Sequence, residues 1–95
     1  MGTARVIHGP EEFGLLEPGE ILVCRYTDPT WTPLFNVAAA VVADTGGPLS
    51  HAAIVAREVG IPAVLGTQSG TQDIMSGQTI RVDGKTGLVT PVESE

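Results

Sequence analysis

Short apolar runs, separated by glycine, proline and polar residues, give this chain the pattern of a small sheet protein. Runs rich in Val, Ile, Leu and Ala predict strands at 4–7, 20–26, 40–43, 61–65, 78–82 and 88–92. The third run is ambiguous, because the alanines of 37–43 favour helix and its valines favour strand, and we assign a strand at 40–43. Asp83-Gly84 opens a turn at 83–87, so the last two strands should form a hairpin, followed by a polar tail at 93–95.

Residues 51–59 have helical spacing instead, with apolar positions three and four apart on one face: Ala52, Val55, Ala56 and Val59. Ser50 is a good N-cap, Gly60 is a natural stop, and Arg57 suits the negative end of the helix dipole. Single helical turns are expected within 11–16, 31–35 and 68–75, the second capped by Asp28 or Thr30. The pattern therefore predicts an α/β fold with small mixed sheets and one main helix.

The length of 95 residues suits one domain, residues 1–95. Because 42% of the residues are hydrophobic and only 4% aromatic, the core of that domain should be aliphatic. The single cysteine, Cys24, excludes an internal disulfide. Since Cys24 lies in an apolar run, we expect it to be a core residue of a cytoplasmic protein.

Charge narrows the possible partners. Five basic and eleven acidic residues give a net charge of −6, which argues against nucleic acid and against an anionic membrane surface. No targeting segment and no apolar run of membrane-spanning length is visible, so we expect a soluble protein. A phosphate site in such a chain must rely on backbone N–H groups and local dipoles.

The junction between the loop 44–50 and the helix 51–59 is the strongest candidate for chemistry. His51 stands where a helix N-terminus offers N–H groups and positive potential, which disfavours imidazolium and attracts a phosphate dianion. Glycines at 46 and 47 allow close approach of the backbone, and hydroxyls at 45 and 50 add donors: the predicted phosphate-binding set is Thr45, Gly46, Gly47 and Ser50. A neutral imidazole at this place can accept a phosphoryl group, hold it and pass it on.

His51 also has three other interpretations: a surface residue, a zinc ligand and a neighbour of a catalytic serine. It can be an ordinary surface residue of a capped helix. A zinc site would need His8, Cys24 and His51 together, and no spacing matches a zinc motif, so no metal site is predicted. A serine hydrolase centred on Ser50 lacks the glycine-flanked turn and the separate partners of such enzymes.

The segment TGGPLSHAAIVAREVGIPAVLGT, 45–67, resembles the phosphohistidine (mobile, swivelling) domain of the PEP-utilising enzymes. That family includes phosphoenolpyruvate synthase, pyruvate phosphate dikinase, Enzyme I and rifampicin phosphotransferase. YTDPTWTPLF at 26–35 and VDGKTGLV at 82–89 resemble its upstream segment and closing hairpin, so the similarity runs from about 18 to 92.

The resemblance implies a swivelling β/β/α domain whose catalytic residue is His51. It implies a phosphotransferase of the kinase or dikinase type, in which this domain carries phosphate between an ATP or PEP site and an acceptor site. Those sites belong to nucleotide-binding and acceptor- or PEP-binding partner domains, where Mg²⁺ is expected. We therefore expect a fragment or a stand-alone copy of a multidomain phosphotransferase, with no cofactor of its own and no turnover alone.

Three positions modify that expectation. Leu49 stands where most of the family has threonine, so one hydroxyl near His51 is missing. Leu49 and the segment TDPTWTPLF together make the chain more similar to rifampicin phosphotransferase than to Enzyme I. Thr27 matches a threonine that lies near the histidine ring in relatives, although it can equally cap the loop. Arg57 follows the family pattern and can contact phosphate, although we interpret it first as a helix-end charge.

A different class of function is also open: a binding or regulatory module that keeps the swivelling fold without the chemistry. Its docking surface would be the apolar group at 31, 33–35 and 49, namely Trp31, Pro33, Leu34, Phe35 and Leu49. A swivelling domain with some other ligand is a third possibility, since fold alone does not fix function.

Overall fold

The computed structural model describes residues 2–47, 49–68 and 70–92. Its strands form one six-stranded mixed sheet in the order β4-β3-β2-β1-β5-β6, in which β1 to β4 run parallel and β5 and β6 are antiparallel additions. The strands are β1 (Gly2–Val6), β2 (Ile21–Cys24), β3 (Ala40–Ala43), β4 (Ala63–Leu65), β5 (Thr79–Asp83) and β6 (Leu88–Pro91). The helical segments are η1 (Pro10–Leu15), η2 (Pro29–Trp31), α1 (Thr32–Phe35), α2 (His51–Val59) and α3 (Gly70–Asp73).

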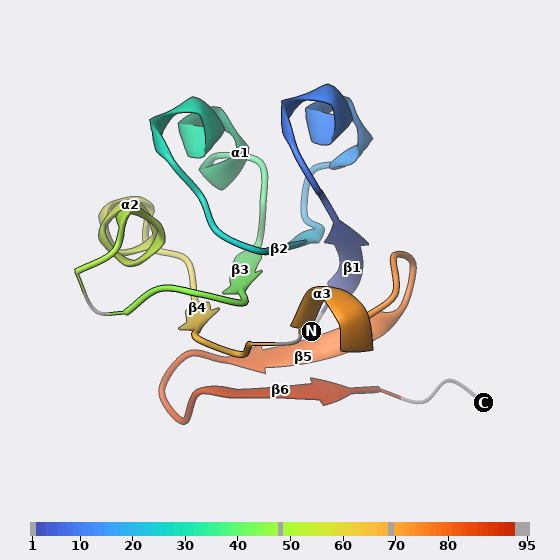
Figure 1. Cartoon of the computed structure of the whole chain (residues 1–95). Helices are drawn as coiled ribbons and strands as arrows, with labels where there is room; N and C mark the ends of the chain where they lie inside the picture. The colour runs from blue at the N-terminus through green and yellow to red at the C-terminus, as the bar shows by residue number, and fades with distance from the viewer. Residues whose placement is uncertain (1, 48, 69, 93–95) are drawn as a thin grey trace.

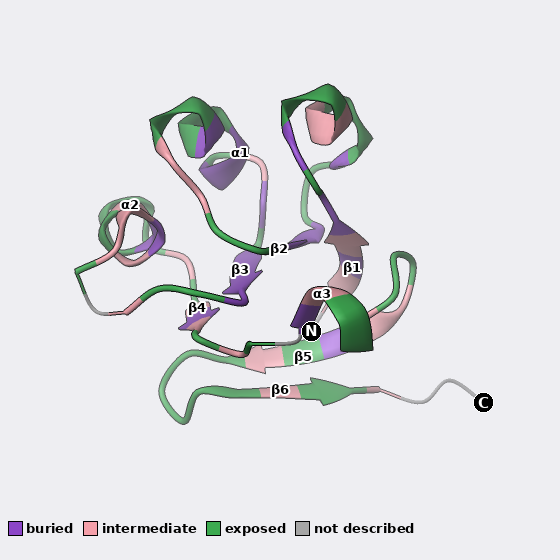
Figure 2. Cartoon of the chain, in the orientation of Figure 1, coloured by how far each residue is buried: buried purple, intermediate pink, exposed green. Residues whose placement is uncertain are grey.

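The parallel strands are covered on both faces. The segments η1, η2, α1 and α2 lie on one side, and the hairpin β5–β6 curves across the other, which makes the sheet nearly a closed barrel (Figure 1). Because side chains alternate along a strand, Leu22 and Cys24 of β2 face the helices, whereas Ile21 and Val23 face β5. Burial is concentrated in β2 and β3, and the hairpin turn is exposed (Figure 2).

The predicted elements are confirmed, with small shifts at their ends. The first strand begins at Gly2, and residues 61 and 62 precede β4. On α2 the buried positions are Ala52 and Ala56, whereas Val59, predicted on the core face, is 39% exposed, because the core covers only the first two turns of the helix. Parts of three predictions lie outside the described residues: Pro48 of the loop, Ser69 of the segment 68–75, and the tail 93–95.

Cys24 is a core residue, as predicted. Its side chain is fully buried between the sheet and the helices, and it is a free thiol. Burial, with a smaller contribution from the negative charge of Asp44, raises the pKa of the thiol to about 12. Cys24 therefore stays protonated at neutral pH and is a packing residue. Among the described residues, no helix has the length and apolar character needed to cross a membrane.

A paired carboxylate joins β1 to the segment that precedes β2. Glu20 accepts hydrogen bonds from Arg5 Nε (3.0 Å) and Nη2 (2.7 Å), and its Oε1 also accepts from the Glu17 N–H. The Arg5 hydrogen bonds, more than any other cause, hold the pKa of Glu20 below its ordinary value of 4.5. Folding therefore favours the ionised form of Glu20, and that stabilisation is complete above the ordinary glutamate pKa.

We expect this stabilisation to disappear as the pH falls through the lowered pKa of Glu20, since protonation removes the ion pair only in the folded state. Urea unfolding midpoints measured from pH 7 down to pH 3 should fall more steeply for the wild type than for Glu20→Gln, which has no carboxylate to titrate. Glu11→Gln, at an exposed glutamate outside this cluster, is the control and should keep the wild-type slope. Equal slopes for the wild type and Glu20→Gln would contradict the prediction.

Candidate functional site

His51 is the first residue of α2, and the cap before it has the predicted form. Ser50 has extended backbone, and its Oγ accepts a hydrogen bond from the Ala53 N–H at 3.3 Å while donating to the Gly47 carbonyl at 2.8 Å. Gly60, with φ of 80°, ends the helix in the left-handed conformation expected at that position. The half-buried imidazole of His51 therefore lies at the positive end of a nine-residue helix.

Two threonine hydroxyls contact the His51 ring, one at each nitrogen. Thr27 Oγ1 lies 2.8 Å from Nδ1 in a partly buried contact, and Thr32 Oγ1 lies 3.3 Å from Nε2 in an exposed one. The ring of Phe35 packs edge-on against the imidazole, with centroids 5.9 Å apart and an angle of 85°. Thr27, at Nδ1, and Phe35, against the ring, therefore fix the orientation of the imidazole. The contact of Thr32 with Nε2 lies on the exposed edge of the ring.

The segment that carries these partners is itself held firmly. Asp28 caps η2 by accepting the Thr30 N–H at 2.9 Å, which confirms one of the two predicted caps. Trp31 is 5% exposed and packs against Phe13 with ring centroids 4.9 Å apart. Because η2 leads directly into α1, this packing fixes the place of Thr32 beside α2.

The loop residues predicted to bind phosphate have other contacts in this structure. Thr45 Oγ1 donates to the Arg25 carbonyl at 3.1 Å, and the Ser50 hydroxyl is occupied by the helix cap. Gly46 has φ of +125°, and a Cβ there would lie 3.1 Å from Ser50 Oγ, so glycine is required. Gly47 has open space around its Cα, so its lack of a side chain is not a steric requirement.

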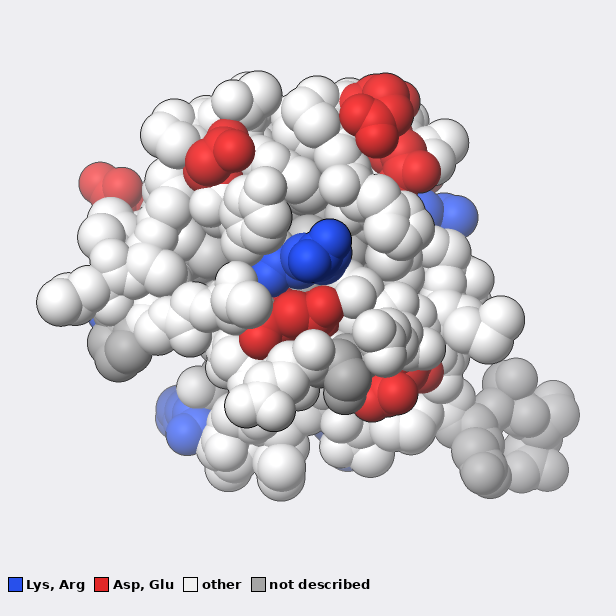
Figure 3. Space-filling view, viewed as in Figure 1, with Lys and Arg blue, Asp and Glu red and all other residues white. Residues whose placement is uncertain are grey.

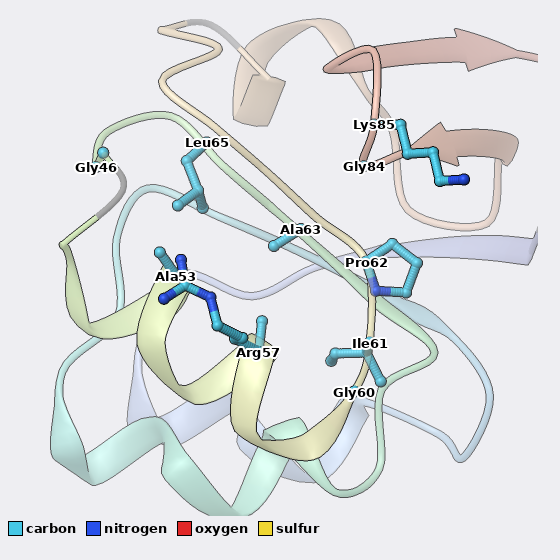
Figure 4. A pocket seen from close by; sticks show the side chains of 12 residues that line it. Gly46, Ala53, Arg57, Gly60, Ile61, Pro62, Ala63, Leu65, Gly84 and Lys85 are labelled. Atoms are coloured by element: carbon cyan, nitrogen blue, oxygen red, sulfur yellow. The ribbon is translucent and has the colours of Figure 1, made fainter.

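Arg57 lies away from the histidine. It lines a groove of about 860 Å³ between α2, the β4 segment and the β5–β6 turn, and His51 is not among the residues that line this groove. Figure 4 shows Arg57 beside Ala53 on α2, with Lys85 of the hairpin turn at the opposite end. The structure therefore brings Thr27 to His51 and places Arg57, with Gly46 and Gly47, along the groove.

Charges on the surface are dispersed. On the face shown in Figure 3, the Lys and Arg side chains occur at separate places among acidic ones and form no continuous basic patch. Within the described ranges, no group of three His, Cys, Asp or Glu side chains is arranged to hold a metal ion.

The prediction that Trp31, Pro33, Leu34, Phe35 and Leu49 form one apolar docking surface is wrong. Trp31, Leu34 and Phe35 are 5%, 7% and 1% exposed, because they fill the core between the helices and the sheet. Only Pro33 and Leu49 of that group reach solvent, and Leu49 is 85% exposed.

Sequence reasoning missed Thr32. Its residue type and its place in a short helix beginning Thr-Pro are typical of a capping threonine, and no local signal connects it with a histidine 19 positions later. Only the packing of α1 against α2 makes the contact visible.

Comparison with known proteins gives one family match, and it covers most of the chain. Residues 16–87 match the family described as the PEP-utilising enzyme mobile domain. A segment of chondramide synthase from Chondromyces crocatus is 60% identical over 89 residues, or 94% of this chain. Phosphoenolpyruvate synthase of Aquifex aeolicus (strain VF5) is 50% identical and rifampicin phosphotransferase of Streptomyces sviceus 48% identical, each over 93% of this chain.

A solved structure supports the same grouping. The solution structure of Enzyme I superposes with a TM-score of 0.73 and 32% identity, over 87% of this chain and 34% of that one. The chain spans only 2% of the chondramide synthase and 10–11% of the synthase and the phosphotransferase. The similar proteins are thus much longer and contain this domain as one part.

Proposed function

The chain belongs to the PEP-utilising enzyme mobile domain family, and on that basis we propose that it is a phosphoryl carrier in which His51 is transiently phosphorylated. Its relatives include a phosphoenolpyruvate synthase and a rifampicin phosphotransferase. The observation that carries the proposal is the position of the imidazole at the start of α2. Its Nδ1 is hydrogen-bonded to Thr27, and its Nε2 lies on the exposed side, beside Thr32.

This arrangement selects Nε2 as the nucleophile. A neutral imidazole has one N–H and one lone pair, and the nitrogen that attacks must carry the lone pair. Nδ1 faces Thr27 in the more buried contact, whereas the Nε2 edge is the one that an incoming phosphoryl group can reach. In the reactive tautomer Nδ1–H donates to Thr27 Oγ1.

Phosphoryl transfer to His51 forms one N–P bond and breaks one O–P bond of the donor. The Nε2 lone pair forms the N–P bond in line with the bond that breaks, and the leaving oxygen of the donor takes that bond's electron pair. Nδ1 then loses its proton to solvent, leaving a neutral imidazole ring that carries the anionic phosphoryl group. Because a hydroxyl both accepts and donates, Thr27 can accept from Nδ1–H before transfer and donate to the Nδ1 lone pair afterwards. Thr27 is therefore a positioning residue that serves both states.

The start of α2 favours the charge that arrives. The first N–H groups of a helix have no intrahelical acceptor, and together with the dipole they stabilise an anion near the N-terminus. In this proposal Ser50 and Gly46 shape that end of the helix, and Gly47 and Thr45 complete the loop beside it. Arg57 acts as a helix-end charge.

The donor and acceptor sites lie on partner domains. We infer a nucleotide- or PEP-binding domain on one side and an acceptor-binding domain on the other, with Mg²⁺ accompanying the phosphates there, in a cytoplasmic enzyme. The chain alone would carry the phosphoryl group without completing a catalytic cycle.

The direct test is chemical phosphorylation of the chain with phosphoramidate, followed by phosphorus NMR and peptide mapping at neutral pH. We expect a phosphoramidate signal on Nε2 of His51, lost in acid and stable in alkali. The exposed His8 serves as an internal reference for an unassisted histidine. The rival interpretation, a binding module without chemistry, predicts that His51 is phosphorylated no faster than His8 and loses the phosphoryl group no more slowly, and that result would overturn the proposal.

A further inference from the structure

We propose that Thr32 is the side chain that binds the phosphoryl group on His51. This inference rests on the proposed function and adds a residue to its site. Thr32 Oγ1 lies 3.3 Å from Nε2, the atom that forms the bond to phosphorus, and the side chain is exposed at the open edge of the ring.

The hydroxyls of Thr27, Thr45 and Ser50 are not available to Nε2, because one contacts Nδ1 and two donate to backbone carbonyls. Thr27 contacts Nδ1, Ser50 donates to the Gly47 carbonyl, and Thr45 donates to the Arg25 carbonyl. Leu49, in the loop before the helix, is exposed and has no hydroxyl to offer. Among these hydroxyls of the described residues, that of Thr32 is therefore the one within hydrogen-bond distance of Nε2.

The two states of His51 give Thr32 two acceptors in turn. In the free domain its hydroxyl donates to the Nε2 lone pair, and this contact favours the Nδ1–H tautomer that the transfer needs. Once Nε2 is bonded to phosphorus that lone pair is gone, and a phosphoryl oxygen becomes the acceptor. A hydrogen bond to an anionic oxygen is stronger than one to a neutral nitrogen, so Thr32 favours the phosphorylated state.

The backbone holds this hydroxyl in place before the phosphoryl group arrives. The Thr32 N–H donates to the Pro29 carbonyl, and the neighbours Trp31 and Phe35 are 5% and 1% exposed. Thr32 therefore enters the site on a packed segment, and little ordering is needed when the phosphoryl group binds.

The experiment compares Thr32→Val, which has nearly the same shape but no hydroxyl, with Thr32→Ser, which keeps the hydroxyl. Thr30→Val is the matched control, because Thr30 is an exposed threonine on the same segment whose hydrogen bond to Asp28 uses its backbone N–H. Each full chain is phosphorylated with phosphoramidate, and the decay of the phosphorus signal of His51 is followed at neutral pH. Nitrogen-15 chemical shifts of the unphosphorylated ring report the tautomer and the hydrogen bond at Nε2.

We expect phosphohistidine in Thr32→Val to decay about tenfold to a hundredfold faster, the range that a hydrogen bond to a charged group gives. The Nε2 shift should move in the same variant, whereas Thr32→Ser and Thr30→Val should match the wild type in both measurements. A wild-type lifetime in Thr32→Val would overturn the assignment of Thr32 alone. Formation and decay of phosphohistidine at His51 that match those at His8 in the wild type would instead overturn the proposed function, so the two failures are distinguishable.

Discussion

Replacing His51 with alanine is expected to abolish phosphoryl transfer in a multidomain enzyme that carries this chain. The nucleophile is the only atom of the domain that bonds to phosphorus in the proposed cycle, so its removal should lower kcat by at least about 10⁴-fold. A suitable host is the Aquifex aeolicus phosphoenolpyruvate synthase, which is 50% identical over 91 residues, with this chain in place of its own matching segment. Folding should be nearly unaffected, because His51 is only half-buried.

The matched control is His8→Ala in the same chimera. His8 is an exposed histidine whose ring contacts Glu12 at 2.9 Å, outside the proposed site, so its removal should leave kcat unchanged. The measurements are steady-state turnover and the yield of acid-labile, alkali-stable phosphoprotein. Transfer that persists in the His51→Ala chimera at the level of the unsubstituted chimera would show that another group carries the phosphoryl group.

Replacing Asp44 with alanine is expected to cause a large loss of stability. Asp44, at the end of β3, is 7% exposed, and its carboxylate accepts from the Thr71 N–H (3.0 Å), the Thr71 hydroxyl (2.6 Å) and the Thr67 hydroxyl (3.2 Å). Alanine leaves partly buried donors of Thr67 and Thr71 without an acceptor, at a cost of about 2–4 kcal/mol in the free energy of unfolding. That is a considerable part of the stability of a domain this small, about 5–15 kcal/mol.

Urea unfolding provides the measurement, with Thr71→Val as the comparison. That variant removes one donor and keeps the carboxylate acceptor of the others, so we expect a loss of only about 1 kcal/mol. The double variant should be less destabilised than the sum of the two single variants, since they share one interaction. A loss below about 0.5 kcal/mol in Asp44→Ala would mean that water replaces the threonines without cost.

The sequence was informative about elements because their signals are local. The spacing of Ala52 and Ala56, the capping residue Ser50 and the stop at Gly60 place α2 within one residue of its observed bounds. The burial of both faces of β2 and β3 agrees with their uninterrupted apolar runs. Boundaries that depend on pairing, such as the start of β1 at Gly2 opposite β5, were less accurate, because the partner strand lies far away in the sequence.

The candidate site divides in the same way. His51 was identified from a local pattern, a glycine-containing loop and a capped helix, together with a long similarity to one family. The sequence showed only part of the roles of Ser50 and Gly46 in shaping the loop. A helix cap and a glycine in a loop are local signals, whereas the hydrogen bond from the Ser50 hydroxyl to the Gly47 carbonyl and the positive φ of Gly46 are seen only in the structure. Arg57 could not be assigned to the groove or to the histidine from its spacing alone.

By itself the sequence determined which elements form, which residue is the candidate for chemistry and which family the chain resembles, because propensity, capping and motif spacing act over a few residues. The tertiary structure decided what surrounds His51: Thr27 at Nδ1, Thr32 at Nε2 and Phe35 against the ring, from segments 16 to 24 positions earlier. It also decided that Trp31, Leu34 and Phe35 are core rather than surface. Contacts of this kind arise when α1 and the segment after β2 pack against α2, and a side chain's partner across that packing is fixed by long-range geometry.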